Sequence, residues 1–156
     1  MRGLKRIVSG EDGVEIVEFA LVSMFFFTLI FAVIEFCIVM FAGNFVATAA
    51  QAGSRYAMVR GSDWSTACAS VTQVGCQAST ADVQNFVLSL AHPGMNLTAS
   101  NITVTPLTTK TNGTACVAWA QQCRIQVKVS YTYQVNLLVA SVAIPLSSTS
   151  IETIQD

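Results

Sequence analysis

The sequence predicts an α+β protein in which a long N-terminal transmembrane helix continues into a small exported head. Three patterns support this prediction. Apart from Glu35, no charged residue interrupts the chain from Phe19 to Ala42; apolar residues recur at helical spacing between 80 and 92; and residues 124–135 alternate between polar and apolar. We expect the head to contain a second helix and an antiparallel sheet of three or four strands.

The apolar run is long enough to cross a membrane. A bilayer core requires about 20 residues of α-helix, and residues 14–42 exceed this length. Hydrophobic regions of cleaved secretory signals have only about 7–15 residues, so we expect a permanent, lipid-embedded, single-pass anchor. Three basic residues precede the run, and the next ones are Arg55 and Arg60. This bias predicts a cytoplasmic N-terminus and an exported C-terminal part.

Glu18 is the most informative residue of the anchor, because a carboxylate within the apolar layer costs about 2–3 kcal/mol and calls for a partner. Cleavage between Gly13 and Val14 would create an α-amino group and would make Glu18 the fifth residue and Phe19 the sixth. The amine of one chain and the carboxylate of its neighbour would attract each other strongly in a medium of low dielectric constant. Such pairing sets the register of adjacent helices, so we predict a subunit of a filament or pseudofilament.

These residues resemble the type IV prepilin family, whose leader ends in glycine and whose mature chain carries glutamate fifth and an aromatic residue sixth. Within that superfamily, the strings VEFAL at 17–21, IEF at 34–36 and AGSRYA at 52–57 resemble the TadE-like minor pseudopilins of the tight-adherence (type IVc) pilus system. The resemblance covers Gly13 to about Ala57. Many TadE-like segments have a proline soon after the glutamate–phenylalanine pair; this chain lacks it, so no proline kink is expected.

The resemblance implies a minor pilin or pseudopilin that a prepilin peptidase cuts between Gly13 and Val14 and that acts in the assembly of a type IV pilus. The implied partners are the peptidase, other pilins or pseudopilins, and the assembly platform of the bacterial inner membrane. The head would be periplasmic or extracellular, and the processed chain could enter a surface pilus that serves cell adhesion or secretion. Two alternatives stay open: a subunit of another type IV filament or type II secretion pseudopilus, and an uncleaved signal-anchored receptor-like ectodomain.

Four segments follow from these patterns. We expect a prepilin leader at 1–13, a transmembrane helix at 14–42, a helix extension at 43–60 and a disulfide-stapled head at 61–156. The extension has helix-compatible composition without proline, and Gly61 begins a loop.

Two features of the long helix have two interpretations each. Glu35 lies 17 residues after Glu18, about 25 Å along a helix, where it either reaches headgroups and water or makes an inter-subunit contact, as the resemblance implies. Small residues recur at four-residue spacing beyond it. Such a stripe allows close approach, either by the chain's own head or by neighbouring subunits; its members are Gly43, Ala47, Ala49, Gly53 and Ala57.

Cys37 is expected to be a small apolar packing residue.

The four cysteines of the head, Cys68, Cys76, Cys116 and Cys123, are expected to form disulfides. Four cysteines allow three connectivities, of which Cys68–Cys76 with Cys116–Cys123 closes the shortest loops. A four-thiolate metal site is less favoured, because neither pair has the spacing usual for zinc.

The head should begin its second helix near Thr80, with Ser79 or Thr80 as N-cap and Asp82 in the first turn, and end it at Pro93-Gly94. A short strand is expected around Ile102 and Val104, then the alternating strand at 124–135, then a strand that starts at Val142 and is broken at Pro145. Tyr131 and Tyr133 are expected foremost as core or sheet-face residues, and only secondarily as an adhesive surface.

Composition argues against several classes of function. The net charge is −1 and only 11% of residues are charged, which gives no electrostatic surface for nucleic acid. We find no phosphate-binding loop and no nucleophile with a basic partner, and His92 is a lone histidine best explained as a helix-end residue. We therefore expect no enzyme, no cofactor and no metal.

Overall fold

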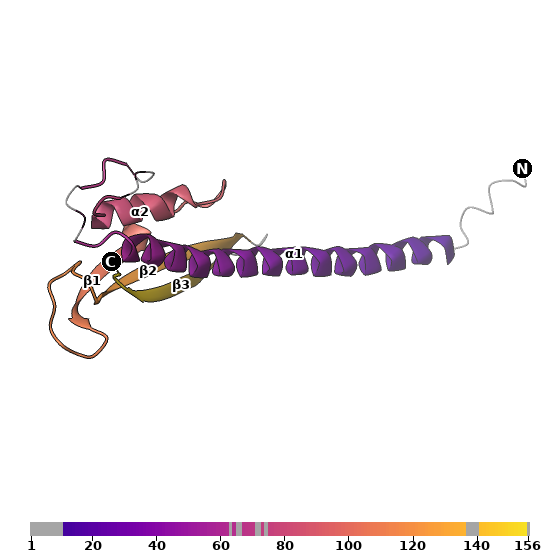
Figure 1. Cartoon of the computed structure of the whole chain (residues 1–156). Helices are drawn as coiled ribbons and strands as arrows, with labels where there is room; N and C mark the ends of the chain where they lie inside the picture. The colour runs from indigo at the N-terminus through magenta and orange to yellow at the C-terminus, as the bar shows by residue number, and fades with distance from the viewer. Residues whose placement is uncertain are drawn as a thin grey trace, which may run out of the picture. The chain divides into compact units, whose positions relative to one another are not determined.

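The computed structural model describes residues 11–62, 64, 67–70, 73, 75–136 and 141–155. Most of the predicted leader lies outside the described residues. The elements are α1 (Glu11–Met58), α2 (Thr80–Ser89), the 3-10 turn η1 (Ala99–Asn101), β1 (Ile102–Lys110), β2 (Cys123–Asn136) and β3 (Ser141–Thr153) (Figure 1). The predicted α+β class is confirmed, with a three-stranded antiparallel sheet. The chain divides into two compact units, Met1–Val39 and Met40–Asp156.

The first unit contains the N-terminal part of α1. Within the described part of the chain, α1 is the one helix that is long and apolar enough to cross a membrane, with a mean hydropathy of 2.6 over its most apolar window. Its large apolar side chains are exposed, among them Phe19 at 73% and Phe25 at 73%. Leaving each such side chain in water forgoes about 1.5–3 kcal/mol of burial, so this segment is a candidate single-pass membrane anchor.

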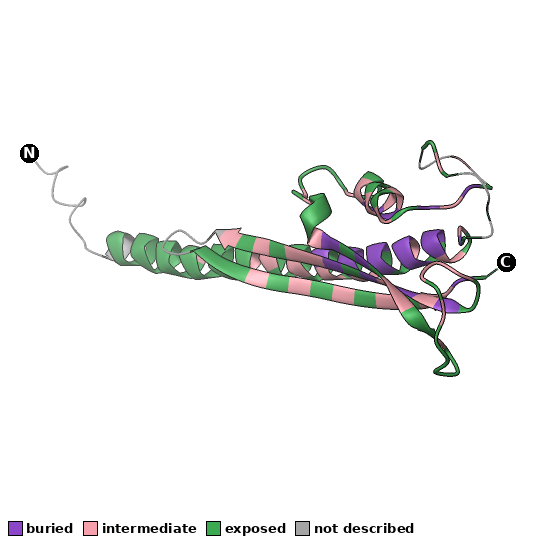
Figure 2. Cartoon of the chain, turned by 90° about the vertical axis from the view of Figure 1, so that its left-hand side faces the viewer, coloured by how far each residue is buried: buried purple, intermediate pink, exposed green. Residues whose placement is uncertain are grey.

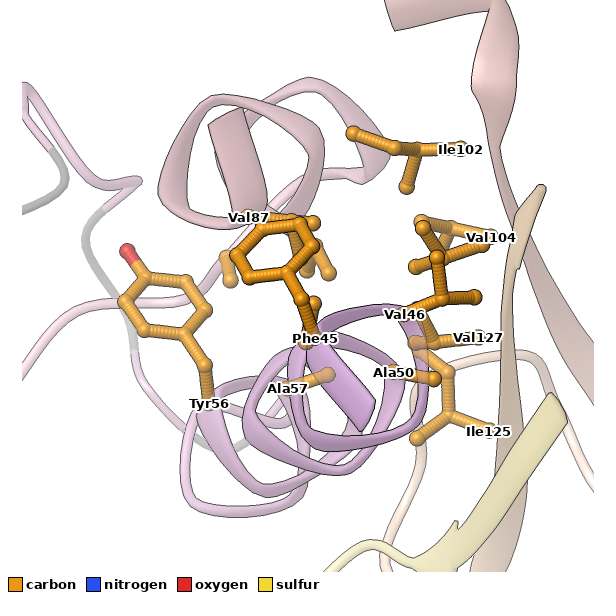
Figure 3. Close-up of a cluster of buried hydrophobic side chains, with 14 of the residues drawn as sticks. Phe45, Val46, Ala50, Tyr56, Ala57, Val87, Ile102, Val104, Ile125 and Val127 are labelled. Atoms are coloured by element: carbon orange, nitrogen blue, oxygen red, sulfur yellow. The ribbon is translucent and has the colours of Figure 1, made fainter. Parts of the chain in front are cut away.

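The second unit is built around the C-terminal part of α1. One face of this part is buried at spacings of three and four residues, and the face with Asn44, Thr48 and Arg55 is exposed (Figure 2). The buried face packs with α2 and the sheet into one apolar core (Figure 3). Its members include Phe45, Val46, Ala49, Ala50, Ala57, Val83, Val87, Ile102, Val104, Ile125, Val127 and Val129.

The strand order is β1-β2-β3, so β2 is central. Its apolar positions Ile125, Val127 and Val129 are fully buried, which confirms the half-buried strand that the alternation predicts. Pairing with β1 begins at Ile102, opposite Val129, and pairing with β3 continues to Asn136.

Two predictions about the outer strands were wrong. The third strand is not broken at Pro145, which pairs with Thr132 in the middle of β3. The first strand is not short, because β1 continues past Pro106 to Lys110, with a register shift between these residues. Both strands lie at a sheet edge, where a residue without an N–H group is tolerated on the outward side.

The start of α2 agrees with the prediction. Ser79 is the N-cap: its hydroxyl accepts a hydrogen bond from the Asp82 N–H (3.3 Å), and the Asp82 carboxylate accepts one from the Ser79 N–H (2.8 Å). This reciprocal capping box satisfies two otherwise unpaired donors. The predicted stop at Pro93-Gly94 was too late, because α2 ends at Ser89 and the Leu90 N–H bonds back to the Val87 carbonyl.

Candidate functional site

The predicted cleavage position lies in the first turn of α1. Gly13 is the third residue of a helix that begins at Glu11, and it is exposed. A Cβ atom added at Gly13 would have no neighbour within 4 Å. The bond between Gly13 and Val14 therefore lies in an exposed stretch of α1.

Glu18 and Phe19 are exposed on the same helix. Phe19 is 73% exposed and lines a shallow apolar hollow with Val22, Ser23, Phe26 and Phe27. Glu18 follows Val14 by four residues, and side chains at this spacing are neighbours on a helix surface. Glu18 is therefore exposed within about one turn of the position where cleavage would create an amine.

Glu35 is half-buried. At 100° per residue, its direction from the helix axis differs from that of Glu18, so the two carboxylates do not form one site. Its predicted inter-subunit contact stays a prediction.

The small-residue stripe divides between two environments. A Cβ atom at Gly53 would lie 2.7 Å from Val87 Cγ2 and 3.2 Å from Val127 Cγ1, whereas nothing lies within 4 Å at Gly43. Ala49 and Ala57 are buried in the same core as Gly53. The later part of the stripe therefore serves the chain's own head, and only the earlier part is open to a neighbour.

The four cysteines of the head lie in the two local pairs. The Cα atoms of Cys68 and Cys76 are 5.0 Å apart and those of Cys116 and Cys123 are 6.0 Å apart. The second pair joins the β1–β2 connection to the first residue of β2. Cys37 is free and exposed on α1.

A stack of three side chains near the end of α1 was not predicted from the sequence. The Tyr56 ring lies on the Phe86 ring of α2 (centroids 4.4 Å apart), and the Arg60 guanidinium lies 4.1 Å from the Tyr56 centroid. Burial raises the pKa of Tyr56, Arg60 lowers it, and Asp82 raises it. The four-residue spacing of Tyr56 and Arg60 could have indicated that these two side chains are neighbours on the helix. No sequence pattern indicated the contact between Tyr56 and Phe86.

Tyr131 and Tyr133 line a hollow of about 430 Å³ with Gly94, Asn96, Asn101, Thr132 and Gln134. Tyr131 also packs against the core, as the sequence favours. Within the described residues, no group of three or more histidine, cysteine or acidic side chains is placed to hold a metal ion.

Comparison with known proteins gives one match. Residues 13–55 match the sequence model of a family described as TadE-like protein. No curated protein and no solved structure matches the chain. The matched segment includes Gly13, Val14, Glu18, Phe19 and Glu35, and it ends before the disulfides and the sheet begin. Over this segment, the chain is similar to TadE-like proteins.

Proposed function

We propose that this chain is a minor pilin or pseudopilin that a prepilin peptidase processes between Gly13 and Val14 and that acts in pilus assembly. One observation carries the proposal: within the TadE-like segment, Gly13, Glu18 and Phe19 stand at motif spacing on the exposed first turns of an apolar helix. The role is structural, and the chain itself is the substrate of the peptidase.

The geometry of α1 supports processing at this position. Gly13 is exposed, and a Cβ atom added there would meet no atom within 4 Å. Cleavage would leave the positive amine of Val14 at a helix N-terminus, where the helix dipole disfavours a cation. Glu15 and Glu18 lie in the first turns of the shortened helix, so their negative charges would offset this cost.

Glu18 then guides assembly. The carboxylate is exposed, so it can reach the amine of an adjacent chain in the membrane, and the pair would fix the axial register of two helices. The amine of the same chain lies one turn away and competes for the same carboxylate. Either pair lowers the cost of a charge in the apolar layer.

The head makes a minor, priming or scaffold role more suitable than that of the main shaft subunit, because major pilins of this system are expected to be much shorter. We place the unassembled chain in the bacterial inner membrane, with its N-terminus in the cytoplasm and its disulfide-linked head outside the cytoplasm, where oxidation is favoured. Its partners are the peptidase, other pilins or pseudopilins, and the assembly platform.

The test is the intact mass and N-terminal sequence of the membrane-extracted chain from cells with and without a prepilin peptidase. We expect Val14 as the first residue only where the peptidase is present. Gly13→Ala is a matched variant: the added methyl group meets no atom within 4 Å, so loss of processing would reflect recognition and not misfolding. A chain that still begins at Met1 in both strains would contradict the proposal and favour an uncleaved signal-anchored ectodomain.

A further inference from the structure

The charged residues of the second unit are segregated. Three stretches contain no Asp, Glu, Lys or Arg, namely 36–54, 83–109 and 129–151, whereas the segments between and after them carry all the formal charges of the head. The sheet register places Val129 opposite both Ile102 and Ser148, and Asn136 opposite Ser141. One end of the sheet is therefore uncharged, and charges begin at Lys128 and continue toward Cys123.

The segment after α2 reaches the start of the head. The His92 ring lies 5.4 Å from the Phe41 ring and 5.6 Å from the Phe45 ring, centroid to centroid. Phe41 and Phe45 are among the first residues of the second unit. The uncharged segment around His92 is thus at the opposite end of this part of α1 from Arg55, which is 14 residues, or about 21 Å, beyond Phe41.

A turn connects these rings to the hollow beside β2. The Met95 N–H bonds to the His92 carbonyl (3.1 Å), and Gly94 within this turn has a φ of 95°. Gly94 lines the hollow together with Tyr131 and Tyr133. Every side chain around the hollow is uncharged, and all except Gly94 carry hydroxyl or amide groups. Aromatic, amide and hydroxyl groups without charge therefore gather at one end of the head.

Exposed apolar side chains occur at the same end. Phe41 is 54% exposed, Leu90 is 37% exposed and Val142 is 47% exposed. We name this surface the aromatic rim, defined by Phe41, Leu90, His92, Tyr131, Tyr133 and Val142. Figure 1 shows that α2 and the sheet flank the same part of α1.

We propose that the aromatic rim lies on the headgroup layer of the membrane that α1 spans. Phe41 is the penultimate residue of the predicted span 14–42, and α1 continues without interruption past it to Met58. The rim therefore contains a residue at the end of the predicted span, and the His92 ring lies beside that residue. Amphipathic aromatic rings favour this interface. Because the rim contains no Asp, Glu, Lys or Arg, contact with lipid desolvates few ions.

The inference rests on membrane anchoring by residues 14–42 and not on processing or pilus assembly. Its consequence is that the head is held against the bilayer before assembly. Extraction of the subunit into a pilus must then break a lipid contact of the head as well as withdraw the anchor.

The test uses the full chain in lipid nanodiscs with one chain per disc and tryptophan fluorescence as the readout. The native tryptophans report on the far end of the head: the Trp64 indole N–H bonds to the Val59 carbonyl, and the Trp119 carbonyl accepts from the Ser62 N–H. Tyr133→Trp, in a background with both native tryptophans replaced by Phe, places a single reporter in the rim. Phe26→Trp in the same background reports on the anchor.

With nitroxide-labelled phosphocholine headgroups, we expect quenching of the Tyr133→Trp reporter to exceed that of the native pair several-fold. With nitroxide on the acyl chains, the Phe26→Trp reporter should be quenched. Quenching of the anchor reporter together with a rim reporter that is no more quenched than the native pair overturns the inference. An unquenched anchor reporter overturns both membrane anchoring and this inference. It does not test the proposed processing by the peptidase, which is measured separately by the mass of the chain. If Tyr133→Trp fails to fold, Thr132→Trp, at an exposed position of the same hollow, gives the same discrimination.

Discussion

Gly43 and Gly53 lie in one helix, ten residues apart, and have opposite surroundings. At Gly53 a methyl group would collide with Val87 and approach Val127, whereas at Gly43 it would meet nothing within 4 Å. Both glycines belong to the second unit, so the difference depends on the face of α1 on which each lies. Gly53 lies on the face that packs against α2 and the sheet, whereas Gly43 is only half-buried (Figure 2). The same helix therefore has different packing requirements on its different faces, because those faces have different neighbours.

The largest effect is expected from Glu18→Gln, which tests an exposed carboxylate in the N-terminal part of α1. Removing the charge removes the proposed pairing with the amine and leaves the apolar span intact. We expect normal membrane insertion and processing but severe loss of pilus assembly, measured by membrane fractionation and by counting pili. Glu15→Gln is the matched control three residues away, and normal piliation in Glu18→Gln would rule out the proposed role of the carboxylate.

Disulfide removal should act on the head alone. Replacing Cys116 and Cys123 together by Ser is expected to destabilise the second unit by about 2–4 kcal/mol, because the unfolded chain regains the freedom of the closed loop. Urea unfolding of the detergent-solubilised chain measures this loss. Cys37→Ser, which changes a free cysteine in the anchor, should leave the midpoint unchanged; equal shifts in both variants would disprove the division.

Alanine at the two glycines tests the comparison directly. Gly53→Ala should destabilise the head by about 1–3 kcal/mol, because the stiff valine side chains that it meets cannot rotate away without a rotamer change. Gly43→Ala should be neutral or stabilise by up to about 1 kcal/mol, because alanine favours the helix. Opposite shifts of the urea midpoint are the expected result. Midpoint shifts of the same sign and size in both variants would show that the close packing around Gly53 is not the reason for glycine at this position.

The smallest effect is expected at Tyr56, where α1 meets α2. In the described part of the chain its buried hydroxyl has no hydrogen-bond partner, so Tyr56→Phe should be neutral or slightly stabilising at pH 7. Burial raises the pKa of Tyr56 above its ordinary value of 10.0. The folded state therefore holds this proton more tightly than the unfolded state, and stability should fall as pH rises above 10.0. In melting curves recorded at increasing pH, the Tyr56→Phe variant should lose less stability at alkaline pH than the wild-type chain. The same loss in both chains would contradict the prediction.

Local sequence determined the long helix, the capping box of α2 and the alternating central strand. Each depends on neighbours within a few residues: an apolar run without proline, Ser79 before Asp82, and every second residue of β2 apolar. The candidate site could also be predicted from the sequence, because Gly13, Glu18 and Phe19 are defined by their spacing along one helix. Only the structure shows that these residues are exposed.

Tertiary structure alone decided which small residues are covered, whether a proline ends a strand, and which aromatic rings meet. Gly53 is confined by side chains from α2 and β2, Pro145 continues β3 because that strand lies at an edge, and Tyr56 stacks on Phe86 from another helix. The physical reason is common to all three. Packing and strand order depend on residues distant in sequence, whose approach no local pattern encodes.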